Sequence, residues 1–149
     1  MNTKLTDDLR TNLVKLAIVA REQAYAPYSN YKVGAALLTK SGRIFTGCNV
    51  ENAAYPDSMC AERVALFKAV SDGERQFDAI AVVTSNGGTP CGSCRQVLAE
   101  FGLGIEVLIA DAEGNLKQEA QLSELLPGAF GPGDMGKREK IYHESHKAQ

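Results

Sequence analysis

The chain has 149 residues, of which 44% are hydrophobic, which is enough for one compact domain with a sizeable core. A formal charge of -2 and a lack of tryptophan argue against a basic, aromatic surface for nucleic acid and favour a small neutral ligand. The sequence lacks a signal-peptide pattern and a run of about 20 apolar residues that could span a membrane. We therefore expect a cytoplasmic protein, in which four cysteines serve as metal ligands or reactive groups more often than as disulfides.

The first expected element is an amphipathic helix that begins after Thr6 and ends before Pro27. Thr6 is a typical N-cap residue, and two acidic residues follow it in the first turn. The apolar residues at helical spacing are Leu9, Leu13, Leu16, Ala17, Ala20 and Ala24. Residues 31–39 and 43–50 are rich in strand formers and flank Ser41-Gly42, so they predict a β-hairpin.

Helices and strands alternate in the second half of the chain. Residues 60–70 are apolar nearly all round, which favours a helix buried inside the fold, and residues 77–84 form a strand buried on both faces. The next expected elements are a helix at 91–101, a strand at 105–110, a strand at 116–118 and a short helix at 122–126. Residues 111–115 are too few for a parallel crossover, so the last two strands should pair antiparallel. We expect one domain over residues 1–130 and a polar, partly disordered tail over 131–149.

Two short motifs place three thiols and one carboxylate at expected helix starts: Cys60-Ala61-Glu62 and Pro90-Cys91-Gly92-Ser93-Cys94. Three thiolate ligands leave zinc one coordination position short of a tetrahedron, which is typical of a catalytic site that keeps that position for water or substrate. Residues 60 and 62 point apart on a regular helix, so Cys60 should be the cap. A carboxylate in such an apolar helix then becomes a candidate acid and base.

Arg63 is the second charged residue at the start of this apolar helix. Three thiolates on Zn²⁺ leave a net charge near −1, by simple counting of charges, and this excess needs compensation. The Arg63 guanidinium and two helix N-termini, each worth roughly half a positive charge, would supply it and keep the thiols deprotonated.

Each of these residues also has a purely structural interpretation. Glu62 could be an ordinary first-turn glutamate that complements the helix dipole. Cys48 could be a small buried residue of a strand, or the fourth ligand of a closed Cys₄ site. In that second case the protein would be a zinc-stabilised scaffold and not an enzyme.

Five segments together resemble the small homotetrameric cytidine deaminases with a three-cysteine zinc site. The resemblance runs from about residue 25 to residue 130. The segments that carry it are Y-K-V-G-A-A at 31–36, C-N-V-E-N-A-A-Y at 48–55, C-A-E-R at 60–63, P-C-G-S-C-R-Q at 90–96 and L-L-P-G-A-F at 125–130. It implies a three-layer α/β/α sandwich with a five-stranded mixed sheet.

The resemblance also implies an activity and a role for each site residue. The activity is hydrolytic deamination of cytidine and deoxycytidine to uridine and deoxyuridine in pyrimidine salvage, with one Zn²⁺ per chain. Cys60, Cys91 and Cys94 would hold the zinc, Glu62 would shuttle protons, and Arg63 would compensate the thiolate charge. Substrate contacts would come from Asn49 and Glu51 on the ribose, the Ala61 backbone on the pyrimidine, and Asn52, Ala53, Ala54, Tyr55 and Phe130 reaching neighbouring active sites.

Tyr31 stands where this family often has phenylalanine, and its hydroxyl would lie beside the expected sugar and base pocket. Substrate preference therefore stays open at this point. A polynucleotide deaminase would share the zinc motif, but it should show basic and aromatic residues for single-stranded bases. A deaminase for cytosine-nucleoside antibiotics is a third possibility, for which the N-x-E-N-A-A-Y segment is less suited.

Overall fold

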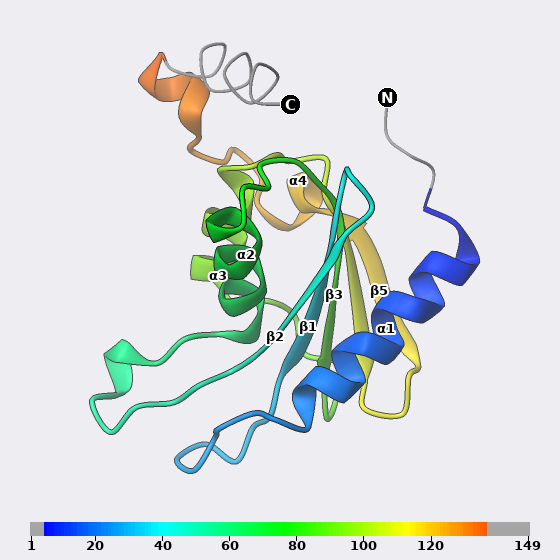
Figure 1. Ribbon diagram of the computed structural model, residues 1–149. Coiled ribbons are helices and arrows are strands. Elements are labelled where there is room, and N and C mark those ends of the chain that lie inside the picture. The colour runs from blue at the N-terminus through cyan, green and yellow to red at the C-terminus, as the bar shows by residue number, and fades with distance from the viewer. Residues whose placement is uncertain (1–4, 137–149) are drawn as a thin grey trace.

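The computed structural model describes residues 5–136, and its centre is a five-stranded sheet with the strand order β2-β1-β3-β4-β5 (Figure 1). The strands are β1 (Gly34–Thr39), β2 (Ile44–Cys48), β3 (Phe77–Thr84), β4 (Glu106–Asp111) and β5 (Leu116–Gln121). Strands β3 and β4 run parallel, and the other neighbouring pairs are antiparallel. The expected mixed sheet and the antiparallel pairing of the last two strands are thus confirmed.

Helices cover both faces of this sheet. Helix α1 (Asp7–Arg21) lies on one face, whereas α2 (Ala61–Ser71) and α3 (Gly92–Ala99) lie on the other (Figure 1). The described residues end with a short helix α4 (Leu122–Leu125) and a 3₁₀ helix η2 (Pro132–Met135), and another 3₁₀ helix, η1 (Tyr55–Asp57), interrupts the loop before α2. This arrangement is the predicted α/β/α sandwich.

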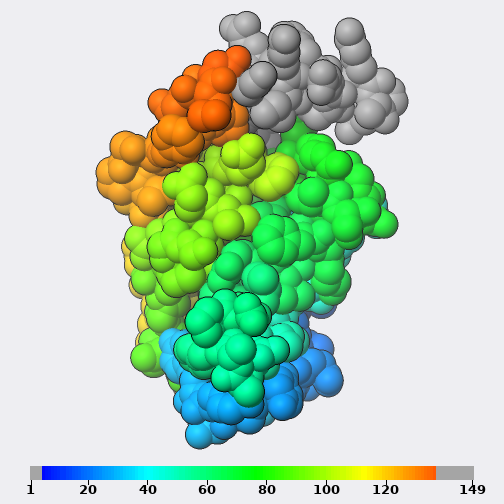
Figure 2. Space-filling view, turned by 90° about the vertical axis from the view of Figure 1, so that its left-hand side faces the viewer, coloured from blue at the N-terminus to red at the C-terminus, as the bar shows by residue number. Residues whose placement is uncertain are grey.

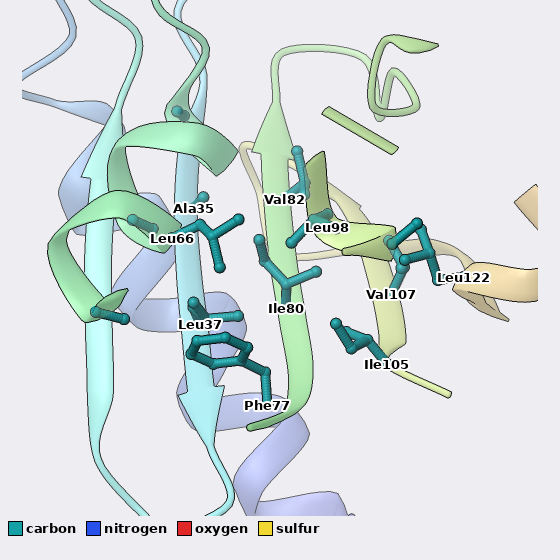
Figure 3. Close-up of a cluster of buried hydrophobic side chains, with 14 of the residues drawn as sticks. Ala35, Leu37, Leu66, Phe77, Ile80, Val82, Leu98, Ile105, Val107 and Leu122 are labelled. Carbon is teal, nitrogen blue, oxygen red and sulfur yellow. The ribbon is translucent and has the colours of Figure 1, made fainter. Parts of the chain in front are cut away.

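Strand β3 joins two hydrophobic cores because its side chains alternate between the faces of the sheet. Ile80 and Val82 pack with Leu66 of α2 and Leu98 of α3 in the cluster shown in Figure 3. Ala79, Ala81 and Val83 pack on the opposite face in the cluster that contains Leu13 and Ala17 of α1. The prediction of a strand buried on both faces is confirmed. The same strand gives α2 and α3 a common surface to pack against.

Helix α1 begins as predicted but ends earlier. Thr6 is its N-cap, with the hydroxyl oxygen accepting a hydrogen bond from the Leu9 amide at 3.2 Å. The helix stops at Arg21 and does not run on to Pro27, because the amides of residues 22, 23 and 24 bond to carbonyls three positions back and tighten the last turn. The chain then turns so that Tyr25 can form a β-bridge with Val50.

The first strand also begins later than predicted, at Gly34 and not at residue 31. Side-chain hydrogen bonds take the place of the strand ladder in this segment. The Val33 amide donates to Oδ1 of Asn49 at 2.9 Å, and Nδ2 of Asn49 donates to the Tyr31 carbonyl at 2.8 Å. The second strand ends at Cys48, so Asn49 and Val50 of the predicted strand lie beyond it.

Helix α2 is less buried than its composition suggested. Its inner face is buried, but Phe67 is 46% exposed and Val64 and Val70 are half-buried. An apolar stripe of α2 is therefore left on the surface of the single chain.

The prediction for the tail lies mostly outside the described residues, which end at Gly136. Between residues 5 and 136, no helix has the length and apolar character that crossing a membrane requires.

Candidate metal centre and active site

Three cysteine thiols converge where α2 and α3 begin. The Sγ atoms of Cys60 and Cys91 are 3.8 Å apart, those of Cys91 and Cys94 are 3.5 Å apart, and all three lie within 4.8 Å of one another. Four ligands around zinc at about 2.3 Å in a tetrahedron would place neighbouring sulfur atoms about 3.8 Å apart. The cluster therefore fits three of the four corners of a zinc site.

The local fold explains why the thiols meet. Cys60 and Cys91 are the N-cap residues of α2 and α3, in extended backbone conformations, and Cys94 lies in the first turn of α3. Cys60 is thus the cap, as its distance from Glu62 in the sequence predicted. Both helix N-termini point their partial positive charge at the cluster, which stabilises thiolates.

Gly47 in β2 allows α2 to lie close enough to the sheet to bring Cys60 to the cluster. A Cβ atom at residue 47 would lie 2.6 Å from the carbonyl oxygen of Ala61 and 2.6 Å from the amide nitrogen of Ala65. Both of these are backbone atoms of the first turns of α2. A side chain at residue 47 would therefore push the helix, and Cys60 with it, away from the sheet.

Arg63 provides the positive charge that the cluster needs. Its Nη2 atom donates a hydrogen bond to Sγ of Cys60 at 3.4 Å, and its buried Nε has no hydrogen-bond partner among residues 5–136. Pairing with Cys94, and secondarily with Arg63, lowers the pKa of the Cys60 thiol to about 5. The same pairing raises the pKa of Cys94.

Glu62 lies beside these thiols in the first turn of α2, and the three sulfur atoms meet without it. Its side chain is buried, with the residue only 4% exposed, and it lines the same cavity as Cys60 and Cys91. Burial raises the pKa of this carboxyl, and the nearby Cys60 charge raises it further. A raised pKa makes a carboxyl group a better proton acceptor, which suits a general base that later acts as an acid.

A cavity of about 410 Å³ opens over the cluster. Its volume falls within the range of small-ligand sites. The predicted site residues that line it are Tyr31, Asn49, Glu51, Tyr55, Cys60, Glu62, Arg63 and Cys91. Cys94 is buried behind the other ligands and completes the thiol cluster without lining the cavity.

Glu51 and Asn49 hold the segment before β1 at the edge of the cavity. The Glu51 carboxylate accepts hydrogen bonds from the amides of residues 28 and 29, at 2.9 and 3.0 Å, and from the Ser29 hydroxyl. The Ser29 hydroxyl, together with these amides, lowers the pKa of Glu51. Since Asn49 also binds residues 31 and 33, both side chains are already oriented in the chain alone.

Several cavity residues were missed by the sequence analysis. Ser29, Ser58 and Met59 line the cavity from the loops before β1 and α2, and Thr84, Gly88 and Thr89 line it from the end of β3 and the loop after it. These residues belong to loops that meet only through the fold. Their one usable signal is proximity to the motifs, since Ser29 lies just before Tyr31 and Thr89 just before Pro90-Cys91.

Other predicted residues lie outside the cavity of their own chain. Asn52, Ala53 and Ala54 are exposed, and Asn52 accepts a hydrogen bond from the Ala54 amide at 2.8 Å. Ala61 is fully buried in the first turn of α2. Phe130 is 59% exposed, and its carbonyl accepts a hydrogen bond from Nε2 of Gln96 at 2.7 Å.

Cys48 is half-buried in β2 and is absent from the thiol cluster, so it does not act as a fourth ligand here.

Two segments on the side of the molecule that carries α2 and α3 lie far apart. Residues 49–57 form a loop that projects below α2 and α3, whereas residues 127–136, drawn in orange, lie at the opposite end of the same face (Figure 2).

Comparison with known proteins agrees with this site. Residues 8–110 match the family described as "Cytidine and deoxycytidylate deaminase zinc-binding region". A cytidine deaminase of Sporosarcina psychrophila is 54% identical over 119 residues, covering 78% of this chain and 87% of the relative. One of Halalkalibacterium halodurans is 53% identical over 129 residues, covering 85% and 97%.

Solved structures give the same result. The crystal structure of cytidine deaminase from Burkholderia pseudomallei superposes with a TM-score of 0.76 at 51% identity, covering 80% of this chain and 97% of that one. That of cytidine deaminase from Mycobacterium tuberculosis superposes with a TM-score of 0.73 at 39% identity, covering 85% and 98%. The chain belongs to the cytidine and deoxycytidylate deaminase zinc-binding family.

Proposed function

We propose that the protein is a zinc-dependent hydrolase that converts cytidine and deoxycytidine to uridine and deoxyuridine with release of ammonia. The observation that carries the proposal is the position of Glu62, a buried carboxyl with a raised pKa that shares a nucleoside-sized cavity with the thiol cluster. A closed structural site would have neither the open coordination position nor a proton carrier beside it. We place the reaction in pyrimidine salvage.

The chemistry supplied by one Zn²⁺ on Cys60, Cys91 and Cys94 is acidification of a water molecule to a pKa of about 7, which makes water a nucleophile at neutral pH. Glu62 would accept one proton of the attacking water at a carboxylate oxygen and pass it to N3 of the pyrimidine as the water oxygen bonds to C4. It would then take the second proton from that oxygen and pass it to the amine at C4, which leaves as ammonia when the C4–N bond breaks. One carboxyl group thus acts as base and then as acid, a role typically worth about 10²–10⁴ in rate.

Substrate orientation falls to the residues at the edge of the cavity. Asn49 and Glu51 would hold the ribose hydroxyls, and their existing hydrogen bonds to residues 28–33 set their orientation before binding. Tyr31 lines the cavity beside them. Ala61 itself is buried, so its proposed contact with the pyrimidine would use the backbone between Cys60 and Glu62, which both line the cavity. Tyr55 lines the cavity of its own chain, so we assign it a contact there.

We also propose a homotetramer in which neighbouring chains complete each cavity. Three apolar side chains, Phe67, Tyr55 and Phe130, are 46%, 56% and 59% exposed in the single chain. Phe130 and the residues 52–54 lie outside their own chain's cavity, and their segments lie at opposite ends of one face (Figure 2). Contacts from these residues to other subunits would use surfaces that are otherwise left open to water. Light scattering at assay concentration tests this assembly, and a fully active monomer would contradict it.

The chemistry of the thiols also supports a location in a reducing compartment. All four cysteines are free, and three of them are needed as reduced ligands. A reducing compartment preserves such thiols, so we propose the cytoplasm.

The experiment that tests the activity combines metal analysis and a deaminase assay on one preparation. We expect about one zinc per chain and conversion of cytidine and deoxycytidine, followed by their ultraviolet absorbance. The matched control is a single-stranded DNA substrate that contains cytosine, which we expect to be left unchanged. Stoichiometric zinc without deamination of either nucleoside would contradict the proposal and favour a scaffold.

A further inference from the structure

The hydroxyl of Tyr31 bridges two walls of the cavity. Tyr31 lies in the segment before β1, and its hydroxyl donates a hydrogen bond at 2.7 Å to Oδ1 of Asn86, which lies 55 residues further along the chain. Asn86 belongs to the loop of residues 85–89 between β3 and α3. The hydroxyl at residue 31 therefore bonds to this loop.

Asn86 is in turn connected to the cavity wall. Its Oδ1 atom also accepts a hydrogen bond from the Thr84 hydroxyl at 3.3 Å. The same hydroxyl oxygen accepts one from the Gly88 amide at 2.7 Å. Thr84 and Gly88 both line the cavity, so a continuous chain of hydrogen bonds runs from Tyr31 to two further residues of the cavity lining.

The backbone at Gly88 packs directly against the phenol group. A Cβ atom at residue 88 would lie 2.4 Å from the Tyr31 hydroxyl oxygen, closer than nonbonded atoms approach. A side chain at residue 88 would therefore require the phenol or the loop to shift. Two residues further on, the chain enters Pro90-Cys91, the start of the metal-ligand motif.

We propose that Tyr31 is a positioning residue whose hydroxyl fixes the loop of residues 85–89 against the cavity before the nucleoside enters. The proposal deepens the function proposed above and rests on it for the identity of the ligand. If the loop is already ordered, less conformational entropy is lost when the nucleoside binds. Loss of the Tyr31 hydroxyl should therefore change KM more than kcat. Glu62 and the three thiols have no hydrogen bond to this network, which separates it from the chemical step.

The substitution Tyr31→Phe tests the hydroxyl alone, because it keeps the ring. We expect KM for cytidine to rise about two- to tenfold, as the loss of one hydrogen bond allows, with kcat within twofold and zinc content unchanged. Hydrogen exchange without substrate gives a second readout, since the Gly88 amide should exchange faster once the network is broken. An unchanged KM together with unchanged exchange would overturn the proposal, as would an equal loss of zinc and kcat.

Two further variants sharpen the test. Tyr25→Phe removes the hydroxyl of an exposed tyrosine outside the cavity lining, and it should leave both KM and the exchange of Gly88 unchanged. Asn86→Ala should reproduce the Tyr31→Phe effect, and the double variant should be no worse than either single one. Fully additive effects would show that the two residues act separately. Because exchange is measured without substrate, an inactive wild-type protein would refute the proposed function and still leave the bridge testable.

Discussion

The guanidinium of Arg63 donates a hydrogen bond to Sγ of Cys60, with Nη2 and Sγ 3.4 Å apart. The donor and the acceptor belong to the same first turn of α2, so the charge that offsets the thiolates is built into the element that presents the first ligand. In the proposed function, one short stretch of helix would therefore supply a metal ligand, an acid–base group and a compensating charge.

Arg63→Gln should weaken zinc binding, because a neutral amide leaves the thiolate cluster with an excess negative charge. Loss of a partner that orients and neutralises a ligand typically costs about 10–100-fold in metal affinity. Competition with a chromophoric chelator measures this change. Arg75→Gln is the matched control, since Arg75 bonds to the carbonyl of Val70 at the far end of α2 and to that of Glu74 just beyond it. An equal loss of affinity in this control would contradict a local role for Arg63.

Glu62→Gln should keep zinc and fold but lose most of the turnover. Glutamine has nearly the same shape but cannot carry a proton, so we expect kcat to fall by about 10²–10⁴ or more. Zinc per chain and the melting temperature are measured on the same sample. A variant with kcat near that of the wild type would refute the role of Glu62 as proton carrier.

Cys91→Ala should lose zinc, activity and stability together, because the free energy of metal binding is part of the free energy of folding. Metal analysis and thermal unfolding with and without a chelator measure the effect. Cys48→Ala is the control from β2, and it should retain one zinc per chain. Stoichiometric zinc in Cys91→Ala, or its loss in Cys48→Ala, would show that the ligand set is wrong.

The turn between β4 and β5 should give the protein a defined acid response. Asp111 accepts hydrogen bonds from the amides of Asn115 and Glu113, at 2.9 and 3.0 Å, and the first of these is the largest cause that lowers its pKa to about 2. A pKa that is lower in the folded state adds stability above the ordinary value near 4, and this contribution is lost as the pH falls towards 2.

Urea unfolding of wild type and Asp111→Asn at several pH values tests this response. The free energy of unfolding should differ most near neutral pH, and the difference should shrink between pH values of about 4 and 2. Glu113→Gln is the control, because Glu113 contributes only its amide to the Asp111 carboxylate. A difference between wild type and Asp111→Asn that is independent of pH would contradict the prediction.

Phe130→Ala should raise KM and weaken subunit association together, because one side chain would serve both an interface and a neighbour's pocket. The cost is roughly 2 kcal/mol or more if Phe130 is an interface hot spot. Steady-state kinetics and light scattering over a dilution series measure the two effects. Phe67→Ala, on the exposed stripe of α2, should weaken association without a primary effect on the pocket, and a tetrameric Phe130→Ala with normal KM would remove only the pocket role.

The elements that the sequence predicted well have a local cause. Thr6 caps α1, Cys60 caps α2, and the unbroken apolar run of β3 matches a strand between two cores. The thiol cluster was predictable for the same reason, because its spacing within two short motifs was sufficient. Each of these features depends on residues that are near one another in the chain.

The parts that were not predicted depend on distant residues. Tyr31 and Val33 leave the expected strand because the Asn49 side chain takes their hydrogen bonds, and Ser29 reaches the site through Glu51. The loop of residues 85–89 joins the cavity through Tyr31. Composition and periodicity describe one segment at a time and therefore do not indicate such pairings.

The close approach of α2 to β2 at Gly47 has a consequence for attempts to change the substrate range by directed evolution. Because a side chain at residue 47 would displace the start of α2, the site can be lost through a mutation that leaves every ligand and Glu62 in place. A library that randomises the cavity residues should keep this glycine constant. Inactive clones with changes at Gly47 would otherwise be misread as intolerance of the new pocket, when the cause is a helix that no longer fits.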